Sequence, residues 1–242
     1  SLSRRHPVEY LGVYGTLIRD EMLPFGYTER QLPVIGSLRF DARYGKVKRP
    51  ECPADEPLTF LCVAPDIFFS PVYDTYAACE YFAAVAAAVR PLRNAQVLIK
   101  LRPSAQHRSF FLGAIERAFE GIPHRIFQDE PLEDLCMQAN AAIGCYSTAT
   151  LELLICSMPT VVLGVGGEAD MVKCHFEKYA HEGALLVAYG AQELSAQTAR
   201  LAAPDMRQNL SRKAADFMHR HYAFDGEAAS RLAALIRSLV KQ

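Results

Sequence analysis

The sequence has 242 residues, half of them hydrophobic, with a formal net charge of −1 and a pI near 6.6. This length suits one large domain, or one domain and part of a second. The nearly balanced charge argues against a general electrostatic attraction to nucleic acid or anionic lipid. No apolar run approaches the roughly 20 residues that a membrane-spanning helix needs.

Cysteine and histidine usage indicates a reducing compartment and predicts no metal centre. The seven cysteines are scattered without a Cys-x-x-Cys pair, so we expect free thiols and no disulfide framework. The seven histidines are dispersed as well, and the pair His219 and His221 alone does not provide a metal-ligand pattern. The start, Ser1–Pro7, lacks the apolar core of a signal peptide and has no Met, so we expect a processed, tagged or truncated chain.

The first part of the chain predicts a few short elements and then a linker. We expect a strand at Val8–Tyr14, a helix at Thr16–Phe25 that breaks near Pro24, and a strand at Pro33–Gly36. Residues Ala42–Pro57 contain three prolines and several charges with little periodicity, which is typical of a linker or boundary loop.

From residue 58 onward, apolar β-type runs alternate with helical patterns. The expected strands are Leu58–Ala64, Val97–Leu101, His124–Phe127, Ala141–Ile143, Thr160–Leu163 and Ala184–Ala188. The expected helices are Thr75–Val89, His107–Phe119, Leu132–Ala139, a helix that begins near Ser147 and ends at Pro159, Gln192–Leu201, Met206–His221 and Gly226–Leu239. This alternation predicts an α/β fold: a doubly wound, Rossmann-like parallel sheet with right-handed crossovers and extra C-terminal helices.

One turn of this pattern is suited to binding an anion. After the strand Ala141–Ile143, Gly144 is expected to permit a sharp turn because it has no Cβ. Ser147 or Thr148 then offers a hydroxyl as the N-cap of the next helix. Free backbone N–H groups and the positive end of the helix dipole favour a phosphate at such a turn. The alternative is that both hydroxyls serve only as helix caps.

Ligands of doubly wound sheets bind beyond the carboxyl ends of the strands. That rule selects four loops, Pro65–Pro71, Lys100–Ser104, Gly144–Thr148 and Gly164–Asp170. Strand alternation would put Lys100 and Arg102 on the same side of their strand, where both could address one phosphate. The alternative is that Lys100 and Arg102 are exposed to solvent or form salt bridges with acidic side chains. The fingerprint G-x-G-x-x-G and the P-loop pattern are absent, which disfavours a dinucleotide enzyme and a P-loop protein.

Two further segments of these loops carry carboxylates. Glu152 lies one helical turn beyond Thr148, and it is either exposed, paired with a neighbouring basic side chain, or directed at ribose hydroxyls in the crevice. Gly164–Asp170 is expected to be a flexible loop, which either contacts a phosphate through the N–H groups of Gly166 and Gly167 or binds no ligand.

Four segments resemble a known group of enzymes. Val97–Ser104 (VLIKLRPS) resembles the Lys-x-His-Pro-Ser segment of bacterial capsule and teichoic-acid transferases, which include sialyl- and Kdo-transferase-like enzymes and CDP-glycerol glycerophosphotransferases. Ile143–Glu152, followed by Met158–Val162, resembles their Ser-Ser/Thr motif and the next strand. Val34–Asp41 resembles their domain-junction segment, and Gly183–Leu232 is similar to GT-B C-terminal tails. The order of the pieces resembles the C-terminal, nucleotide-sugar-binding domain of a GT-B glycosyltransferase over nearly the whole chain.

The resemblance implies a substrate, partners and a location. The donor would be a CMP-, CDP- or UDP-linked sugar, with no other cofactor and no metal. The acceptor would be a growing glycan or a lipid-linked molecule. We expect a cytoplasmic protein, with peripheral association at the inner face of the bacterial inner membrane through the full-length protein. The late helices either pack back across the sheet or form a homodimer contact.

The resemblance also implies a set of binding residues. Those that would bind the nucleotide and its phosphate are Lys100, Arg102, Ser104, Gly144, Tyr146, Ser147, Thr148 and, on the ribose, Glu152. Further loop contacts would come from Pro65, Asp66, Gly166 and Gly167. Arg102 stands where the family has His, and a guanidinium does not donate its proton near neutral pH, so no catalytic residue is assigned.

The same resemblance implies that most of an N-terminal acceptor domain, with its catalytic base, is missing. Residues 1–45 would be its remnant, 46–57 a linker and 58–242 the donor-binding domain. We therefore expect nucleotide binding and little activity from this chain alone. The alternatives are a nucleotide-sugar epimerase or hydrolase of GT-B shape, and a non-catalytic module for binding or assembly.

Overall fold

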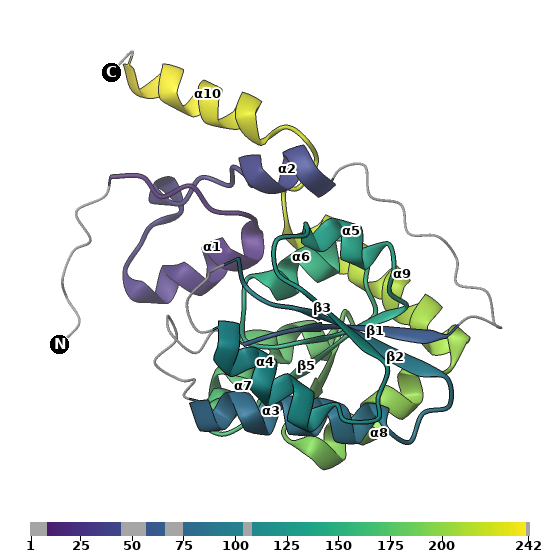
Figure 1. Cartoon of the computed structure of the whole chain (residues 1–242). Helices are drawn as coiled ribbons and strands as arrows, with labels where there is room; N and C mark the ends of the chain where they lie inside the picture. The colour runs from purple at the N-terminus through teal and green to yellow at the C-terminus, as the bar shows by residue number, and fades with distance from the viewer. Residues whose placement is uncertain (1–8, 45–56, 66–74, 104–107, 241–242) are drawn as a thin grey trace. The chain divides into compact units, whose positions relative to one another are not determined.

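A computed structural model of the chain describes residues 9–44, 57–65, 75–103 and 108–240 (Figure 1). The chain forms two compact units, one of Ser1–Val47 with Asp216–Gln242 and one of Lys48–Ala215. Residues 216–242 therefore group with the start of the chain, whereas the sequence-based division assigns them to the donor-binding domain. The assignment of the first segment to an acceptor domain stays a prediction.

The second unit contains a sheet of six parallel strands in the order β3-β2-β1-β4-β5-β6. The strands are β1 Leu58–Val63, β2 Ala95–Lys100, β3 His124–Phe127, β4 Ala141–Gly144, β5 Thr160–Leu163 and β6 Leu186–Ala188. All six match predicted strands, with bounds shifted by up to two residues. The prediction of a doubly wound α/β fold with a parallel sheet is confirmed.

Seven helices of the described chain connect and follow these strands. They are α3 Thr75–Val89, α4 Arg108–Ala118, α5 Leu132–Cys136, α6 Ala149–Ile155, α7 Glu168–His181, α8 Ala191–Leu201 and α9 Pro204–His221. In Figure 1, α3, α4 and α8 cover one face of the sheet, and α5, α6 and the first part of α9 cover the other. The four central strands β1, β2, β4 and β5 are thus buried on both sides, as their continuous apolar runs require, whereas the edge strands β3 and β6 are partly exposed.

Helix α7 corrects the prediction of a flexible loop at 164–170. Gly166 adopts a left-handed φ of 53° and turns the chain, so Glu168 already lies in the first helical turn. Along α7, Val172, Phe176 and Tyr179 form a buried stripe at helical spacing, which stabilises the helix against the sheet. The two glycines and the acids obscured this pattern in the sequence.

The alanines of α3 permit a close contact with α8. Ala77, Ala78 and Ala88 are buried, and the hydroxyl of Thr198 on α8 donates to the carbonyl of Ala88 at 3.3 Å. Small side chains let two helix backbones approach, and buried donors then find carbonyl partners across the interface. The alanine-rich run is therefore a packing surface inside the unit.

The first unit is built from short elements. They are α1 Thr16–Met22, the 3-10 turns η1 Leu23–Phe25 and η2 Glu29–Gln31, α2 Leu38–Tyr44 and α10 Ala228–Val240. The predicted strands 8–14 and 33–36 are wrong as sheet strands in their described part, because these segments pair only through one isolated bridge, Val13 to Val34. Helix α2 also runs into the predicted linker, which was expected from Ala42. The rest of that linker up to 56 lies outside the described residues.

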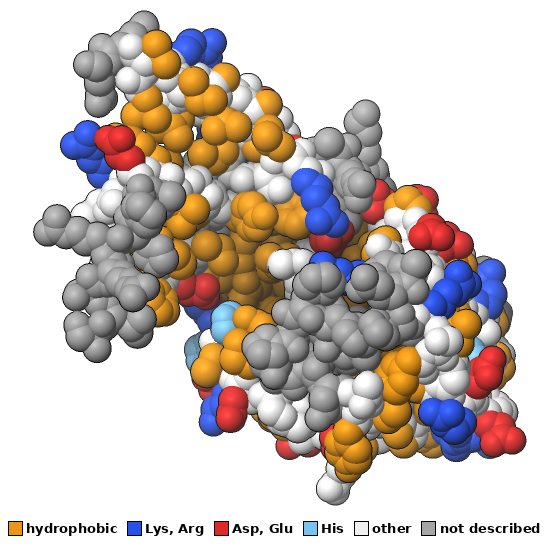
Figure 2. All heavy atoms as spheres, turned by 60° about the vertical axis from the view of Figure 1, so that its left-hand side comes forward, with side chains coloured by type: hydrophobic (Ala, Val, Ile, Leu, Met, Phe, Trp, Pro, Cys, Tyr) orange, Lys and Arg blue, Asp and Glu red, His pale blue; other side chains and the backbone are white. Residues whose placement is uncertain are grey.

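Helix α10 retains an exposed apolar face. Ile236 and Val240 are 52% and 81% exposed, and hydrophobic side chains are visible over this helix at the top of Figure 2. Within the described part of the chain, no helix has both the length and the hydropathy to cross a membrane.

Glycines and one arginine hold the first unit together. A Cβ on Gly15 would lie 1.9 Å from the carbonyl oxygen of His221, and one on Gly36 would lie 2.1 Å from that of Ala223. Arg231 donates from Nε to the carbonyl of Ile35 at 2.8 Å and from its two Nη atoms to the carboxylate of Asp225 at 2.7 and 2.9 Å. Segments nearly 200 residues apart are thus joined by backbone approach and by the bond from Arg231 to Ile35, and the bidentate pair with Asp225 fixes the guanidinium in place.

Replacement of Gly36 should separate conformational strain from steric overlap. Gly36→Ala combines a φ of 88° with the clash against Ala223, so we expect a loss of roughly 2–4 kcal/mol in the free energy of unfolding. Gly26 has a φ of 91° with nothing within 4 Å of its Cβ position, so Gly26→Ala should cost only about 1 kcal/mol. Urea denaturation measures both, and equal losses would contradict the close approach.

Candidate functional site

The direction in which strands are added reverses between β1 and β4. From β1 the chain proceeds through β2 to β3, whereas from β4 it proceeds the other way through β5 to β6. Val63 lies opposite Lys100, and Cys62 opposite Ile143, so the carboxyl ends of β2, β1 and β4 lie side by side. Crossover helices diverge at such a reversal and leave a crevice, which is the usual ligand position of a doubly wound sheet.

Tyr81 of α3 contacts the carboxyl ends of β1 and β4. Its side chain is fully buried, and its hydroxyl lies 2.9 Å from the carbonyl of Val63 and 3.3 Å from that of Ile143. Burial raises the pKa of Tyr81 well above its ordinary value, so the phenol stays a neutral donor to these strand-end carbonyls. Burial also raises the pKa of Cys62 to about 12 and that of Cys145 further, which leaves both thiols without nucleophilic character.

The turn after β4 has a different origin from the one that the sequence predicts. Gly144 is the last strand residue and is not among the glycines with positive φ. It is required because a Cβ would lie 2.9 Å from Oγ1 of Thr150. The Thr150 hydroxyl, which sequence reasoning missed, closes the turn by donating to the carbonyl of Cys145 at 2.9 Å.

The two predicted cap hydroxyls differ. Oγ of Ser147 accepts a hydrogen bond of 3.3 Å from the backbone N–H of Ala149, so Ser147 caps the turn. Thr148 occupies the N-cap position of α6 but makes no side-chain cap bond, and it is exposed. The hydroxyl on the exposed surface is therefore that of Thr148.

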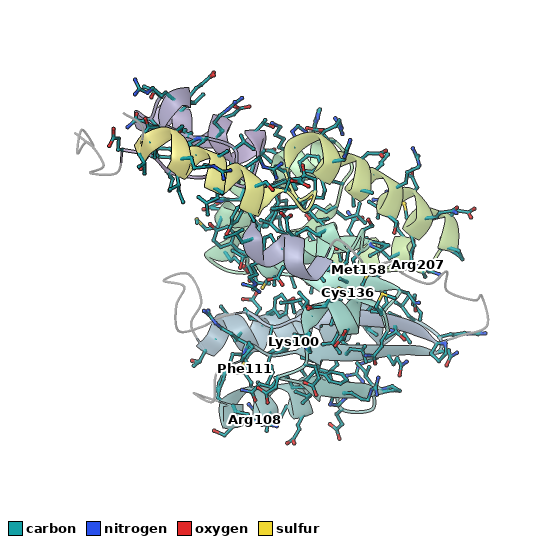
Figure 3. All side chains as sticks on the ribbon, turned by 90° about the horizontal axis from the view of Figure 1, so that it is seen from above. Lys100, Arg108, Phe111, Cys136, Met158 and Arg207 are labelled. Atoms are coloured by element: carbon teal, nitrogen blue, oxygen red, sulfur yellow. The ribbon has the colours of Figure 1, made fainter. Side chains whose placement is uncertain are left out.

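Lys100 and Arg102 do not share a strand face. Lys100 ends β2, so strand alternation does not extend to Arg102, which is exposed in the following loop. The Lys100 side chain is buried (Figure 3), and Nζ donates to the carbonyls of Leu101 at 2.8 Å and Gln128 at 2.6 Å. Its ammonium thus joins the ends of β2 and β3, and Arg102 is the more accessible cation.

Burial lowers the pKa of Lys100 from its ordinary value, and the charges of Glu130, Asp129 and Glu152 act in the opposite direction. Glu152 is 5% exposed on α6, so the alternative of an exposed side chain is wrong, while its contact with ribose hydroxyls stays a prediction. Lys100 and Gly144 stand two strand spacings apart, about 10 Å. The charge of Glu152 acts on Lys100, so these two side chains belong to the same end of the sheet.

The most deeply buried carboxyl is one that sequence reasoning left in a loop. Glu168 has no exposed surface, and its Oε1 accepts a hydrogen bond from the backbone N–H of Tyr146. Burial raises its pKa to about 8. The signal was available, because Glu168 precedes Val172 and Phe176 at intervals of four and so occupies the buried stripe of α7.

Tyr146 contacts α7 a second time. Its hydroxyl lies 3.2 Å from Nε2 of His175, and Nδ1 of the same ring lies 3.0 Å from the carbonyl of Met171. A carbonyl only accepts, so Nδ1 carries the hydrogen in the neutral ring and Nε2 accepts from the tyrosine. The turn after β4 is therefore held to α7 through both the backbone and the side chain of Tyr146.

The remaining predicted residues are placed as follows. Pro65 is buried directly after β1, and Gly166 and Gly167 are exposed before α7. Ser104 and Asp66 lie outside the described residues. Among the described residues, no group of three or more His, Cys, Asp or Glu side chains could hold a metal ion.

The fold and the position of this crevice define a Rossmann-like domain of the kind found in GT-B proteins. No protein-family model and no curated protein matches the chain. Solved structures do match: MnaA of S. aureus with UDP has a TM-score of 0.69 at 12% identity, covering 96% of this chain and 61% of that one. MurG of Acinetobacter baumannii matches with a TM-score of 0.59 at 16% identity, covering 86% of this chain and 56% of that one.

The wall teichoic acid polymerase TagF matches with a TM-score of 0.57 at 14% identity, covering 96% of this chain and 58% of that one. The chain thus spans about three fifths of the length of these structures. At such identities, the similarity establishes the fold.

Removal of the Tyr81 hydroxyl should weaken the sheet at this point. Tyr81→Phe leaves the carbonyls of Val63 and Ile143 without this buried donor, so we expect a loss of about 1–3 kcal/mol in the free energy of unfolding. Tyr76→Phe is the matched control on the same helix, because Tyr76 is 75% exposed. A Tyr81→Phe protein as stable as the control in chemical denaturation would contradict the supporting role.

Glu168 should make stability fall as the pH rises. Its pKa is raised from 4.5 to about 8 in the folded protein, so the folded state keeps a proton that the unfolded state loses between these values. The free energy of unfolding is therefore not reduced by Glu168 below pH 4.5, and it falls by at most about 1.4 kcal/mol per pH unit between pH 4.5 and 8. Glu168→Gln should remove this decline. Urea unfolding from pH 5 to 8 measures it, and parallel profiles for the two proteins would refute the assignment.

Proposed function

We propose that this chain supplies the nucleotide-sugar donor-binding domain of a GT-B glycosyltransferase that acts in bacterial surface polysaccharide synthesis. The observation that carries the proposal is the reversal of strand order between β1 and β4, with a polar turn directly after β4. Structural similarity to proteins of this fold supports it, including one solved with UDP and a TagF variant soaked with CDPG.

The residues of the crevice suit a nucleotide diphosphate. The turn after β4 presents hydroxyl and N–H donors from Ser147 and Thr148, and Arg102 adds an exposed guanidinium across the edge of the sheet. Glu152 would accept hydrogen bonds from ribose hydroxyls. Lys100 contributes positive charge while it fixes the carbonyl of Gln128.

Catalysis in this proposal is electrostatic on the donor side. The leaving phosphate gains charge as the glycosyl bond breaks, and fixed cations and N–H dipoles stabilise that charge without a metal. The acceptor, a growing glycan or lipid-linked molecule, and the base that activates it would be bound by a further domain. We therefore expect the chain alone to bind nucleotide with little turnover.

Epimerisation of a nucleotide sugar is the second candidate. A Listeria monocytogenes protein named as a UDP-N-acetylglucosamine 2-epimerase matches with a TM-score of 0.64 at 15% identity, above the values for MurG and TagF. The same crevice would bind the UDP group in either case. A new sugar epimer detected by NMR after incubation with UDP-N-acetylglucosamine would favour this second candidate.

A nucleotide should raise the melting temperature. CMP, CDP, UDP, GDP and their sugar conjugates are each titrated into the full chain in a thermal-shift assay. A ligand at a hundred times its Kd adds about 2.7 kcal/mol of stability, which corresponds to roughly 5–10 °C for a chain of this size. Arg102→Ala should weaken binding about tenfold or more, because a charge-assisted hydrogen bond to phosphate is lost.

Arg93→Ala is the matched control. Arg93 is also an exposed arginine, but it precedes β2 at the opposite edge of the sheet, so its loss should leave the shift intact. Equal effects of the two substitutions would place the nucleotide elsewhere. No shift with any nucleotide in a folded protein would favour the non-catalytic module.

A further inference from the structure

We propose that Glu168 is a positioning residue of this site: its carboxyl fixes the turn after β4 through Tyr146, and its ionisation weakens the binding of a phosphate there. This inference rests on the proposed function. It means that a residue of α7 that is not among the predicted binding residues makes the affinity for a phosphate depend on pH.

The geometry ties α7 to the turn. Oε1 of Glu168 accepts the backbone N–H of Tyr146, one residue before Ser147. The hydroxyl of Tyr146 contacts Nε2 of His175, two helical turns further along α7. Because Tyr146 is attached to α7 at both points, the hydroxyls that follow it keep a fixed position relative to the ends of β4 and β5.

The second carboxyl oxygen is the unusual feature. Oε2 of Glu168 is buried and has no hydrogen-bond partner among the described residues. An ionised carboxylate in this position has a single N–H donor to offset its desolvation, which is why the neutral acid persists to about pH 8. The neutral acid still accepts the Tyr146 N–H through its carbonyl oxygen.

Within the described residues, titratable groups near Glu168 come from three elements. Tyr146 lies in the turn, and Asp170 and His175 lie on α7 itself. On α3, the carboxylate of Glu80 lies 4.0 Å from the position of a Gly166 Cβ. Among the described residues, no charged side chain shifts the pKa of Glu168: burial raises it, and the N–H of Tyr146 acts in the opposite direction.

A phosphate bound at the turn would oppose ionisation further. Two like charges at one site disfavour each other, so the bound state should raise the pKa of Glu168 above its value in the free protein. By linkage, affinity is highest where Glu168 is neutral in both states and falls as the pH rises through about 8. A difference of one pKa unit between the two states corresponds to a tenfold change in Kd.

Calorimetric titration of the full chain with UDP between pH 7 and 9.5 tests this inference, with CDP and CMP in parallel. Wild type should bind about tenfold more weakly at the upper limit. Glu168→Gln keeps the acceptor for Tyr146 and removes the charge, so it should match wild type at pH 7 and show no decline above pH 8. Since UDP is the same in both titrations, its own ionisation cancels in the comparison.

Two further variants separate positioning from charge. Glu168→Ala removes the acceptor as well, so it should bind several-fold more weakly than Glu168→Gln at every pH. His175→Gln should leave the decline in place. If Glu168→Gln retains the wild-type decline, or if His175→Gln abolishes it, the role of Glu168 is refuted.

The proposed function and this inference fail in different ways. A folded wild-type chain that binds none of UDP, CDP and CMP at pH 7 contradicts the proposed function, and the inference falls with it. Binding that is strong but independent of pH refutes the role of Glu168 alone. Binding by Glu168→Ala as tight as by Glu168→Gln refutes the positioning of the turn.

Discussion

The pairing of β1 with β4 is the contact on which the sheet-bearing unit depends. Right-handed crossovers on either side of it carry the chain in opposite directions, so only here do two neighbouring strand ends lack a helix between them. The buried hydroxyl of Tyr81 contacts carbonyls of both strands at this place. The same constraint that produces this order of six parallel strands therefore also places the Tyr81 hydroxyl at the point where a doubly wound sheet usually binds its ligand.

Two glutamates, one on α6 and one on α7, are buried near the carboxyl ends of the strands. Glu152 lies on α6 within the electrostatic influence of Lys100, whose ammonium is itself held by two carbonyls. Glu168 lies on α7 with one backbone donor and an oxygen that has no partner among the described residues. Glu152 thus lies near a positive charge, whereas Glu168 lies in a buried position that favours its protonated form. Such a division is typical of sites where two acids serve different purposes.

Much of the fold was predictable from the sequence, because continuous apolar runs and helical spacing are local signals. The six strands and most helices of the larger unit follow from them. Helix α7 was not predicted, since the chain-reversing Gly166 and two acids resemble a loop until the stripe at Val172 and Phe176 is counted. The burial of Lys100 was equally hidden, because its ammonium donates to the carbonyls of Leu101 and of Gln128, which follows β3 and lies 28 residues further along the chain.

The smaller unit is assembled from residues before 48 and after 215, with the contiguous sheet-bearing unit between them. During synthesis the ribosome completes every strand of the sheet before it produces the partners of Gly15 and Gly36. The larger unit can therefore condense on the nascent chain before the contacts of Gly15 and Gly36 with residues 221–223 form. The contacts of Arg231 with Ile35 and Asp225 can form only after all six described strands have been synthesised.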